Sequence, residues 1–158
     1  MTTQTFFVAG SHTDIGKTFV ASALLRWAIA RGLRAEAFKP VVSGFDPGDW
    51  GDSDPGRLLA ALGRPLSADG LAAMSPLRYR APLAPPIAAR REGDLLMLSQ
   101  LVTSCRLVRD SWSTDLGLIE GAGGVMTDWS GNRLLAGSDG RVLAVGNAAL
   151  HAQLLASI

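Results

Sequence analysis

The stretch GSHTDIGKT, residues 10–18, decides how this sequence folds. A short apolar run, 5–9, precedes it, and an amphipathic run begins near Phe19. A strand, a glycine-bounded loop and a helix in this order form a cradle whose backbone N–H groups favour an anion. In such a phosphate-binding loop (P-loop), we expect Lys17 to reach the β- and γ-phosphates of a nucleotide and the Thr18 hydroxyl to ligate Mg²⁺.

The match to the strict P-loop pattern is imperfect. Five residues separate Gly10 from Gly16, where the strict pattern has four, so Ser11 stands at the first glycine position. The alternative is a chance Gly-Lys-Thr at the start of a helix. The preceding strand and the following helix are the context that a P-loop requires, and they favour the phosphate-binding interpretation.

Composition narrows the class of protein. The chain has 158 residues, 47% apolar and 18% charged, which fits one globular domain rather than a disordered segment. A net charge of +1 gives no electrostatic reason to expect nucleic acid or an anionic membrane as a partner. The single cysteine, Cys105, excludes an internal disulfide and a cysteine-based zinc site. With no basic, apolar leader and no apolar run long enough for a bilayer, we expect a cytoplasmic protein.

The apolar pattern predicts strands that alternate with helices. The first strand (5–9), a helix (18–31) and a second strand (33–39) form a βαβ unit, which implies a parallel sheet. The predicted fold class is therefore α/β, a P-loop three-layer sandwich with a mostly parallel central sheet flanked by helices. Residues 64–76 are not assigned, and Pro40 is expected to stop the second strand. The remaining predicted segments are strands 115–120 and 141–145 and helices 56–62, 87–92, 95–109 and 148–157.

Three charged residues lie at or after the carboxyl ends of predicted strands, where open α/β sheets bind ligands. Lys39 ends a buried strand and is costly there unless it meets an anion; the alternative is that its ammonium reaches solvent. Glu120 ends an apolar strand beside the P-loop, so it can bring a negative charge to Mg²⁺; the alternative is a surface glutamate in a turn. Asp54 precedes Pro55 and is either a helix cap, a magnesium ligand or both.

These residues together resemble one family. The P-loop, the run FKPVVSG (38–44), Ser53-Asp54 and the run IEGAGG (119–124) look like dethiobiotin synthetase, a member of the P-loop NTPase superfamily. The runs are specific as a set and weak singly. The resemblance covers residues 5 to about 126, and it implies a homodimeric, cytoplasmic ligase of biotin biosynthesis.

The resemblance also implies an activity and a site. The family carboxylates 7,8-diaminopelargonic acid with CO₂ and closes the ring of dethiobiotin, with ATP as co-substrate and Mg²⁺ as cofactor, through a carbamate and a carbamic-phosphoric anhydride. Lys17 and Lys39 would be catalytic, Thr13, Lys39 and Ser43 would contact the substrate, and Thr18, Asp54 and Glu120 would hold the metal. The implied nucleotide contacts are Asp14, Ile15, Gly16, Lys17, Thr18, Phe19, Asp54, Glu120, Gly121, Ala122 and Gly123.

The sequence departs from that family near its end. The segment between Gly124 and Arg141 is short, and the family continues past the position of Ile158 with parts that bind adenine and complete a dimeric site. We interpret residues 1–158 as a single P-loop ATP-binding domain, with the alternative open that loops and the C-terminal part of the family fold are missing. Two other functions stay open: a P-loop ATPase switch of the partitioning or cell-division type, and a non-catalytic nucleotide-binding module.

Overall fold

The computed structural model describes residues 4–10, 14–122, 125–127 and 143–145. Parallel strands flanked by helices confirm the expected α/β class. In chain order the elements are β1 (Gln4–Val8), α1 (Lys17–Ala30), β2 (Ala35–Phe38), β3 (Val41–Ser43), α2 (Asp54–Ala61), α3 (Ala68–Met74), β4 (Leu77–Tyr79), α4 (Pro85–Arg91), α5 (Leu98–Ser111), β5 (Leu116–Glu120), β6 (Val125–Thr127) and β7 (Leu143–Val145).

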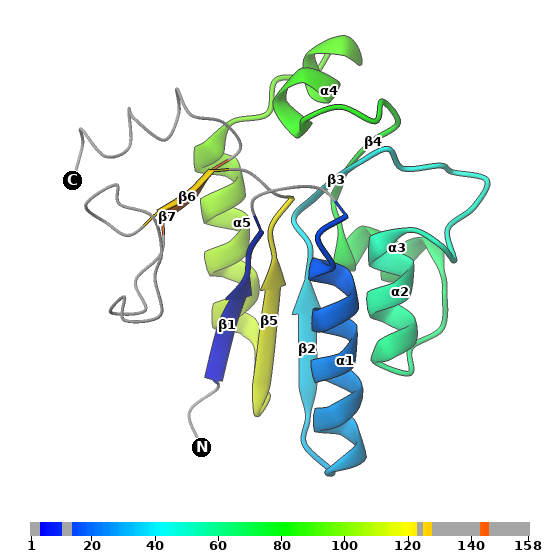
Figure 1. Cartoon of the computed structure of the whole chain (residues 1–158), viewed down its shortest axis with the longest axis vertical. Coiled ribbons are helices and arrows are strands. Elements are labelled where there is room, and N and C mark those ends of the chain that lie inside the picture. Colours follow the sequence, from blue (N-terminus) through cyan, green and yellow to red (C-terminus); the bar gives the residue numbers. More distant parts are fainter. Residues whose placement is uncertain (1–3, 11–13, 123–124, 128–142, 146–158) are drawn as a thin grey trace.

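The central sheet has the strand order β1-β5-β2, with both pairs parallel. The expected βαβ unit is therefore present, but its two strands are not neighbours, because β5 lies between them (Figure 1). Val8 is opposite Glu120 on one side of β5, and Phe38 is opposite Ile119 on the other. The carboxyl end of β5 consequently lies between the P-loop and the segment that carries Lys39.

Helices cover this sheet on both faces. In Figure 1, α1 lies in front of the sheet and α5 behind it. Leu118 of β5 is buried in one core cluster with Ala21 and Leu25 of α1. On the opposite face, Trp112 packs so closely on Gly117 that a Cβ there would lie 2.5 Å from the indole ring. Because side chains alternate along a strand, Leu118 of β5 faces α1, whereas its neighbour Gly117 faces Trp112 at the end of α5.

Strand β2 ends at Phe38, before Pro40, so the expected stop of the second strand is confirmed; the strand that follows Pro40 was not predicted. The chain resumes directly as β3, which pairs in parallel with β4. In the unassigned region 64–76 the structure has α3, whose N-cap Ser67 accepts a hydrogen bond from the N–H of Gly70 at 3.0 Å. Helix α4 packs on β3 and β4. The expected strand 141–145 contains β7, which pairs antiparallel with β6, and the expected helix 148–157 lies outside the described residues.

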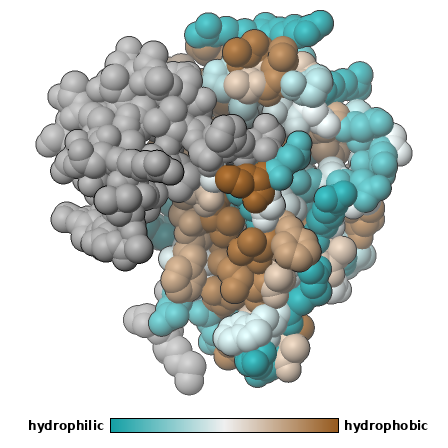
Figure 2. Space-filling view, viewed as in Figure 1, coloured by the Kyte–Doolittle hydropathy of each residue, from teal (hydrophilic) through white to brown (hydrophobic). Residues whose placement is uncertain are grey.

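Apolar side chains remain exposed on the face formed by β1, β5 and the adjoining side of α1 (Figure 2). Because β1 is an end strand of the described sheet, its side chains are covered on one side only. Within the described ranges, no helix is long and apolar enough to cross a membrane. The exposed apolar residues of β1 and α1 are Phe6, Phe7, Phe19, Val20, Leu24, Trp27 and Ile29.

Candidate functional site

The P-loop turns into α1 through two residues with positive φ. Asp14 has a φ of 60° and Gly16, the N-cap of α1, has a φ of 91°, a conformation that glycine adopts without strain. Gly10 is needed for space, since a Cβ there would lie 2.6 Å from Cγ2 of Ile15 and 3.0 Å from Cγ of Lys17. No side chain caps α1, so the cradle is built from backbone at the positive end of the helix.

A buried ion-pair cluster stands next to this loop. Nζ of Lys39 lies 2.6 Å from Oε1 of Glu120 and 2.9 Å from Oδ2 of Asp54. The side chains of Lys39 and Glu120 are 3% and 1% exposed, whereas that of Asp54 is 38% exposed. The hydroxyl of Thr18 donates to the same Oε1 of Glu120 at 2.6 Å. The strand order explains this convergence, because it brings the ends of β1, β5 and β2 to one edge.

Glu120 has one oxygen to spare. Among the described residues, its Oε2 is buried and accepts no hydrogen bond. A buried carboxylate oxygen without a partner is unfavourable unless a cation or donor reaches it. The residues therefore fit a divalent cation, which would find Thr18, Asp54 and Glu120 around it. Mg²⁺ is typically bound by one or two carboxylates plus substrate phosphates, and in the described ranges no group of three or more histidine, cysteine, aspartate or glutamate side chains is placed to hold a metal.

Asp54 is available for this cluster because Ser53, and not Asp54, caps α2. The Ser53 Oγ accepts the N–H of Gly56 at 3.2 Å, and Ser53 is in an extended conformation. Of the alternatives that the sequence leaves open for Asp54, the structure therefore excludes the helix cap. Its carboxylate instead points to Lys39. The signal that identifies the cap is a serine one residue earlier, with Pro55 early in the helix.

The charges of the cluster shift the pKa values of two members. Burial lowers the pKa of the Lys17 ammonium, and the nearby positive charge of Lys39 lowers it further, against the carboxylates of Glu120, Asp54 and Asp14. Burial pushes the pKa of Asp54 upward, but Lys39, Thr18 and Lys17 together outweigh it, so that pKa lies below the usual value. Two ammonium groups close enough to repel each other form a site that an anion between them would stabilise.

The structure brings together five of the predicted site residues: Lys17, Thr18, Lys39, Asp54 and Glu120. Ser43 ends β3 and is half-buried. The N–H of Gly121 donates to the carbonyl of Val8 at 2.9 Å and so continues the sheet. Ala122 packs against the core cluster around Val41. The side chains of Ile15 and Phe19 are exposed, and Thr13 and Gly123 lie outside the described residues.

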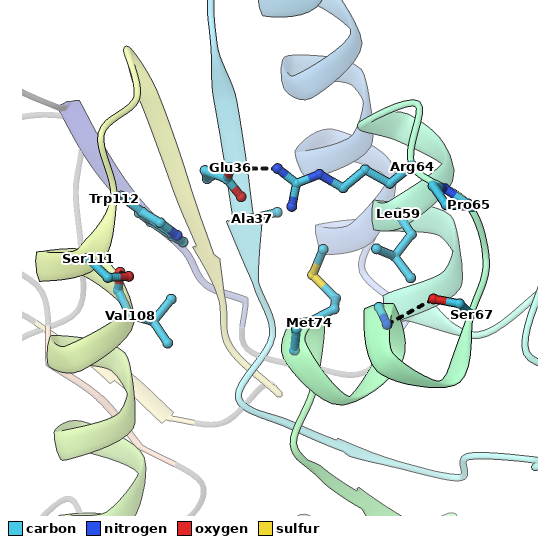
Figure 3. A pocket seen from close by; sticks show the side chains of 12 residues that line it. Glu36, Ala37, Leu59, Arg64, Pro65, Ser67, Met74, Val108, Ser111 and Trp112 are labelled. Atoms are coloured by element: carbon cyan, nitrogen blue, oxygen red, sulfur yellow. Dashed lines mark hydrogen bonds and ion pairs between the residues drawn. The ribbon is translucent and has the colours of Figure 1, made fainter.

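A separate cavity of about 440 Å³ lies between β2, α2, α3 and the end of α5 (Figure 3). Its walls include Leu59, Met74 and Trp112, and two of its lining residues, Glu36 and Arg64, form an ion pair of 2.5 Å. None of the five clustered site residues lines it. This cavity therefore does not belong to the candidate site.

Comparison with known proteins agrees with the resemblance seen in the sequence. An AAA domain family matches residues 4–137. The chain is 58% identical over 124 residues to the ATP-dependent dethiobiotin synthetase BioD of Caulobacter vibrioides, covering 78% of this chain and 55% of the relative. It is 49% identical over 151 residues to the protein of the same name from Phenylobacterium zucineum, covering 93% of this chain and 64% of the relative. The chain thus spans about half to two thirds of the length of these relatives. Because the family match extends over most of the sequence and includes the P-loop and Glu120, the chain belongs to this AAA domain family, and it resembles dethiobiotin synthetases within it.

Proposed function

We propose that this chain carries out ATP- and Mg²⁺-dependent carboxylation and ring closure of 7,8-diaminopelargonic acid with CO₂ to give dethiobiotin. The observation that carries the proposal is the convergence of Lys39, Asp54, Glu120 and Thr18 beside the P-loop. A reaction that joins two anions needs such an arrangement, because positive charge must offset their repulsion in a site that excludes water. The names of the relatives, ATP-dependent dethiobiotin synthetases, support the choice of ATP as co-substrate and dethiobiotin as product.

We assign the following roles to the individual residues. Lys17 binds the nucleotide phosphates together with the backbone from Asp14 to Phe19, with further nucleotide contacts from residues 120–123. Thr18, Asp54 and Glu120 would hold Mg²⁺, which supplies charge neutralisation between the phosphate oxygens when bound. Lys39 meets the carboxylate group formed from CO₂, and Thr13 and Ser43 contact the diamine.

The protein needs no nucleophile of its own. An amine of the substrate attacks CO₂ and loses a proton, which forms a carbamate. A carbamate oxygen then attacks the γ-phosphoryl group, the bond to the β-phosphate oxygen breaks, and ADP leaves. The second amine attacks the carbonyl carbon of the mixed anhydride and loses a proton, the bond from that carbon to the phosphate oxygen breaks, phosphate leaves, and the ureido ring closes. Lys17 and Lys39 stabilise the negative charge of the carbamate and of the phosphoryl group that is transferred to it.

Phosphate release tests this proposal. Release from MgATP that requires both diaminopelargonate and bicarbonate supports it, and release without them contradicts it. We expect Lys39→Ala to abolish turnover while ATP binding is retained, and Lys17→Ala to weaken nucleotide binding itself. Equal loss of turnover and ATP binding in Lys39→Ala would contradict the role of Lys39.

The sequence analysis leaves open a second candidate, a non-catalytic nucleotide-binding module. Tight binding of MgATP with no turnover under any substrate combination would support this candidate. Release stimulated by DNA, lipid or a protein partner would instead indicate an ATPase switch of the partitioning type.

The proposal extends to the state of the protein in the cell. We expect residues 1–158 to form one ATP-binding domain, a cytoplasmic homodimer that binds small molecules and neither nucleic acid nor membrane. The exposed apolar side chains on β1 and α1 support the dimer, because a second subunit packed on this face would remove them from water. Light scattering after size-exclusion chromatography, with and without MgATP, measures the mass; a monomer under both conditions would contradict the dimer.

A further inference from the structure

We propose that Glu92 is a positioning residue for the substrate-binding segment at Ser43, and that it acts through the peptide of Ala81. This inference rests on the proposed role of Ser43 in contacting the diamine. Glu92 comes directly after α4, is remote in sequence from the P-loop and belongs to no motif of the candidate site.

The first link joins Glu92 to the segment after β4. Its Oε1 accepts the N–H of Ala81 at 3.0 Å. The carbonyl on the other side of the same residue accepts the N–H of Gly44 at 3.1 Å. A side-chain carboxylate is thereby connected, through one residue, to the backbone directly after Ser43.

A second link runs alongside the first. The hydroxyl of Tyr79 donates to Oδ2 of Asp94 at 2.6 Å, and the carbonyl of Tyr79 accepts the N–H of Phe45 at 2.9 Å. Burial raises the pKa of the Tyr79 hydroxyl, and the bond to Asp94 raises it further, so this hydroxyl stays a donor across the physiological range. The two residues after Ser43 are thus each tied to one carboxylate of the segment between α4 and α5, Phe45 through Tyr79 of β4 and Gly44 through Ala81 just after β4.

This anchoring matters because the chain turns sharply immediately after Ser43. Gly44 has a φ of 69°, and a Cβ there would lie 3.5 Å from Pro82, so the turn packs against the segment that Glu92 holds. The loop that starts here ends at Asp54, which pairs with Lys39. The Lys39–Asp54 ion pair therefore holds one end of this loop, and the Glu92 and Asp94 links hold the other end. Loss of the Glu92 link would free only the end at Ser43, so we expect Ser43 to move further than the P-loop does.

Three variants test the inference. Glu92→Ala removes the acceptor, and Glu92→Gln keeps an oxygen acceptor without the charge. Glu36→Ala is the matched control, since it removes a carboxylate whose partner, Arg64, lies beside the separate cavity. We expect Glu92→Ala to raise KM for diaminopelargonate about tenfold, which corresponds to about 1.4 kcal/mol and to one hydrogen bond to a charged acceptor. In Glu92→Ala, kcat and the Kd for ATP should change less than about twofold. In Glu92→Gln, KM for diaminopelargonate should return close to that of the unmodified chain.

A second measurement separates this inference from the proposed function. Amide hydrogen exchange at Gly44 and Phe45 should be faster in Glu92→Ala than in the unmodified chain, and close to normal in Glu92→Gln and Glu36→Ala. Unchanged exchange at Gly44 in Glu92→Ala would overturn the inference whatever the chain catalyses. Faster exchange with an unchanged KM would overturn the positioning role. If the unmodified chain shows no diaminopelargonate-dependent turnover, the proposed function fails, and the exchange result still decides whether Glu92 anchors this segment.

Discussion

Replacing Lys39 with methionine probes the buried ion-pair cluster most directly. Methionine keeps an unbranched side chain of similar length, and the backbone bond from the N–H of residue 39 to the carbonyl of Met74 is retained. The variant leaves Glu120, at 1% exposure, and Asp54, at 38% exposure, without their shared cation. Removing one partner of a buried ion pair costs about 3–5 kcal/mol. Because Asp54 is partly hydrated, we expect the lower end, about 3 kcal/mol.

That loss is large for a small domain, whose free energy of unfolding is about 5–15 kcal/mol. Urea unfolding at pH 7 and 25 °C measures it. Arg57→Met is the matched control, since it breaks an exposed ion pair with Asp52 at 3.4 Å, and we expect it to cost less than about 1 kcal/mol. A loss in Lys39→Met no larger than in Arg57→Met would refute the reasoning that the cluster is buried and charged.

A metal titration extends the same test. In Lys39→Met the two carboxylates lose their ion pairs with residue 39, so Mg²⁺ or Mn²⁺ should stabilise this variant more than it stabilises the unmodified chain. The readout is the midpoint of unfolding with and without metal, which is independent of turnover. An equal metal-dependent shift in both proteins would contradict the assignment of Asp54 and Glu120 as metal ligands.

Three further predictions concern the P-loop, the pH dependence and the cap of α2. Gly10→Ala should weaken ATP binding by more than about tenfold in a nucleotide titration, because the new Cβ meets Ile15 and Lys17. The control Gly51→Ala, whose Cβ would meet nothing closer than 4.0 Å, should bind ATP normally. Equal affinities of the two variants for ATP would contradict the packing argument. The lowered pKa of Asp54 means that its contribution to stability is present above about pH 4 and is lost as the pH falls through the folded-state pKa. The difference in unfolding free energy between the unmodified chain and Asp54→Asn should therefore shrink between pH 7 and pH 3, and a constant difference would rule this out. Ser53→Ala should cost about 1 kcal/mol in urea unfolding through loss of the helix cap; no measurable loss would show that another group caps α2.

Much of the fold could be predicted because long segments carry a clear pattern. Helix α1 and strands β1, β2 and β5 lie within or close to the expected segments. The apolar residues of α1 repeat over several turns, and those of the strands form short runs or alternate with polar residues, as in β2. Strands β3 and β4 were not expected, because each has three residues and shows no period. The segment of α3 is also too short to show a clear apolar period, although Ser67 marks its start.

The sequence predicted which residues form a candidate site, and their roles stay predictions, but it predicted none of the contacts among them. Residue type and position at a strand end marked Lys39 and Glu120, and position at a helix start marked Asp54. The bonds that Glu120 makes to both Thr18 and Lys39 depend on β5 lying between β1 and β2, and strand order is set by packing among distant segments.

By itself, the sequence of this protein determined the phosphate-binding loop, the α/β class and the identity of the charged groups at the strand ends, because these depend on local spacing and chemistry. Only the tertiary structure decided that one lysine serves two carboxylates, that Ser53 rather than Asp54 caps α2, and that one oxygen of Glu120 stays buried without a donor among the described residues. The physical reason is that these outcomes depend on which segments, far apart along the chain, meet at the carboxyl edge of the sheet. A charged group that is buried there is unfavourable unless it is paired.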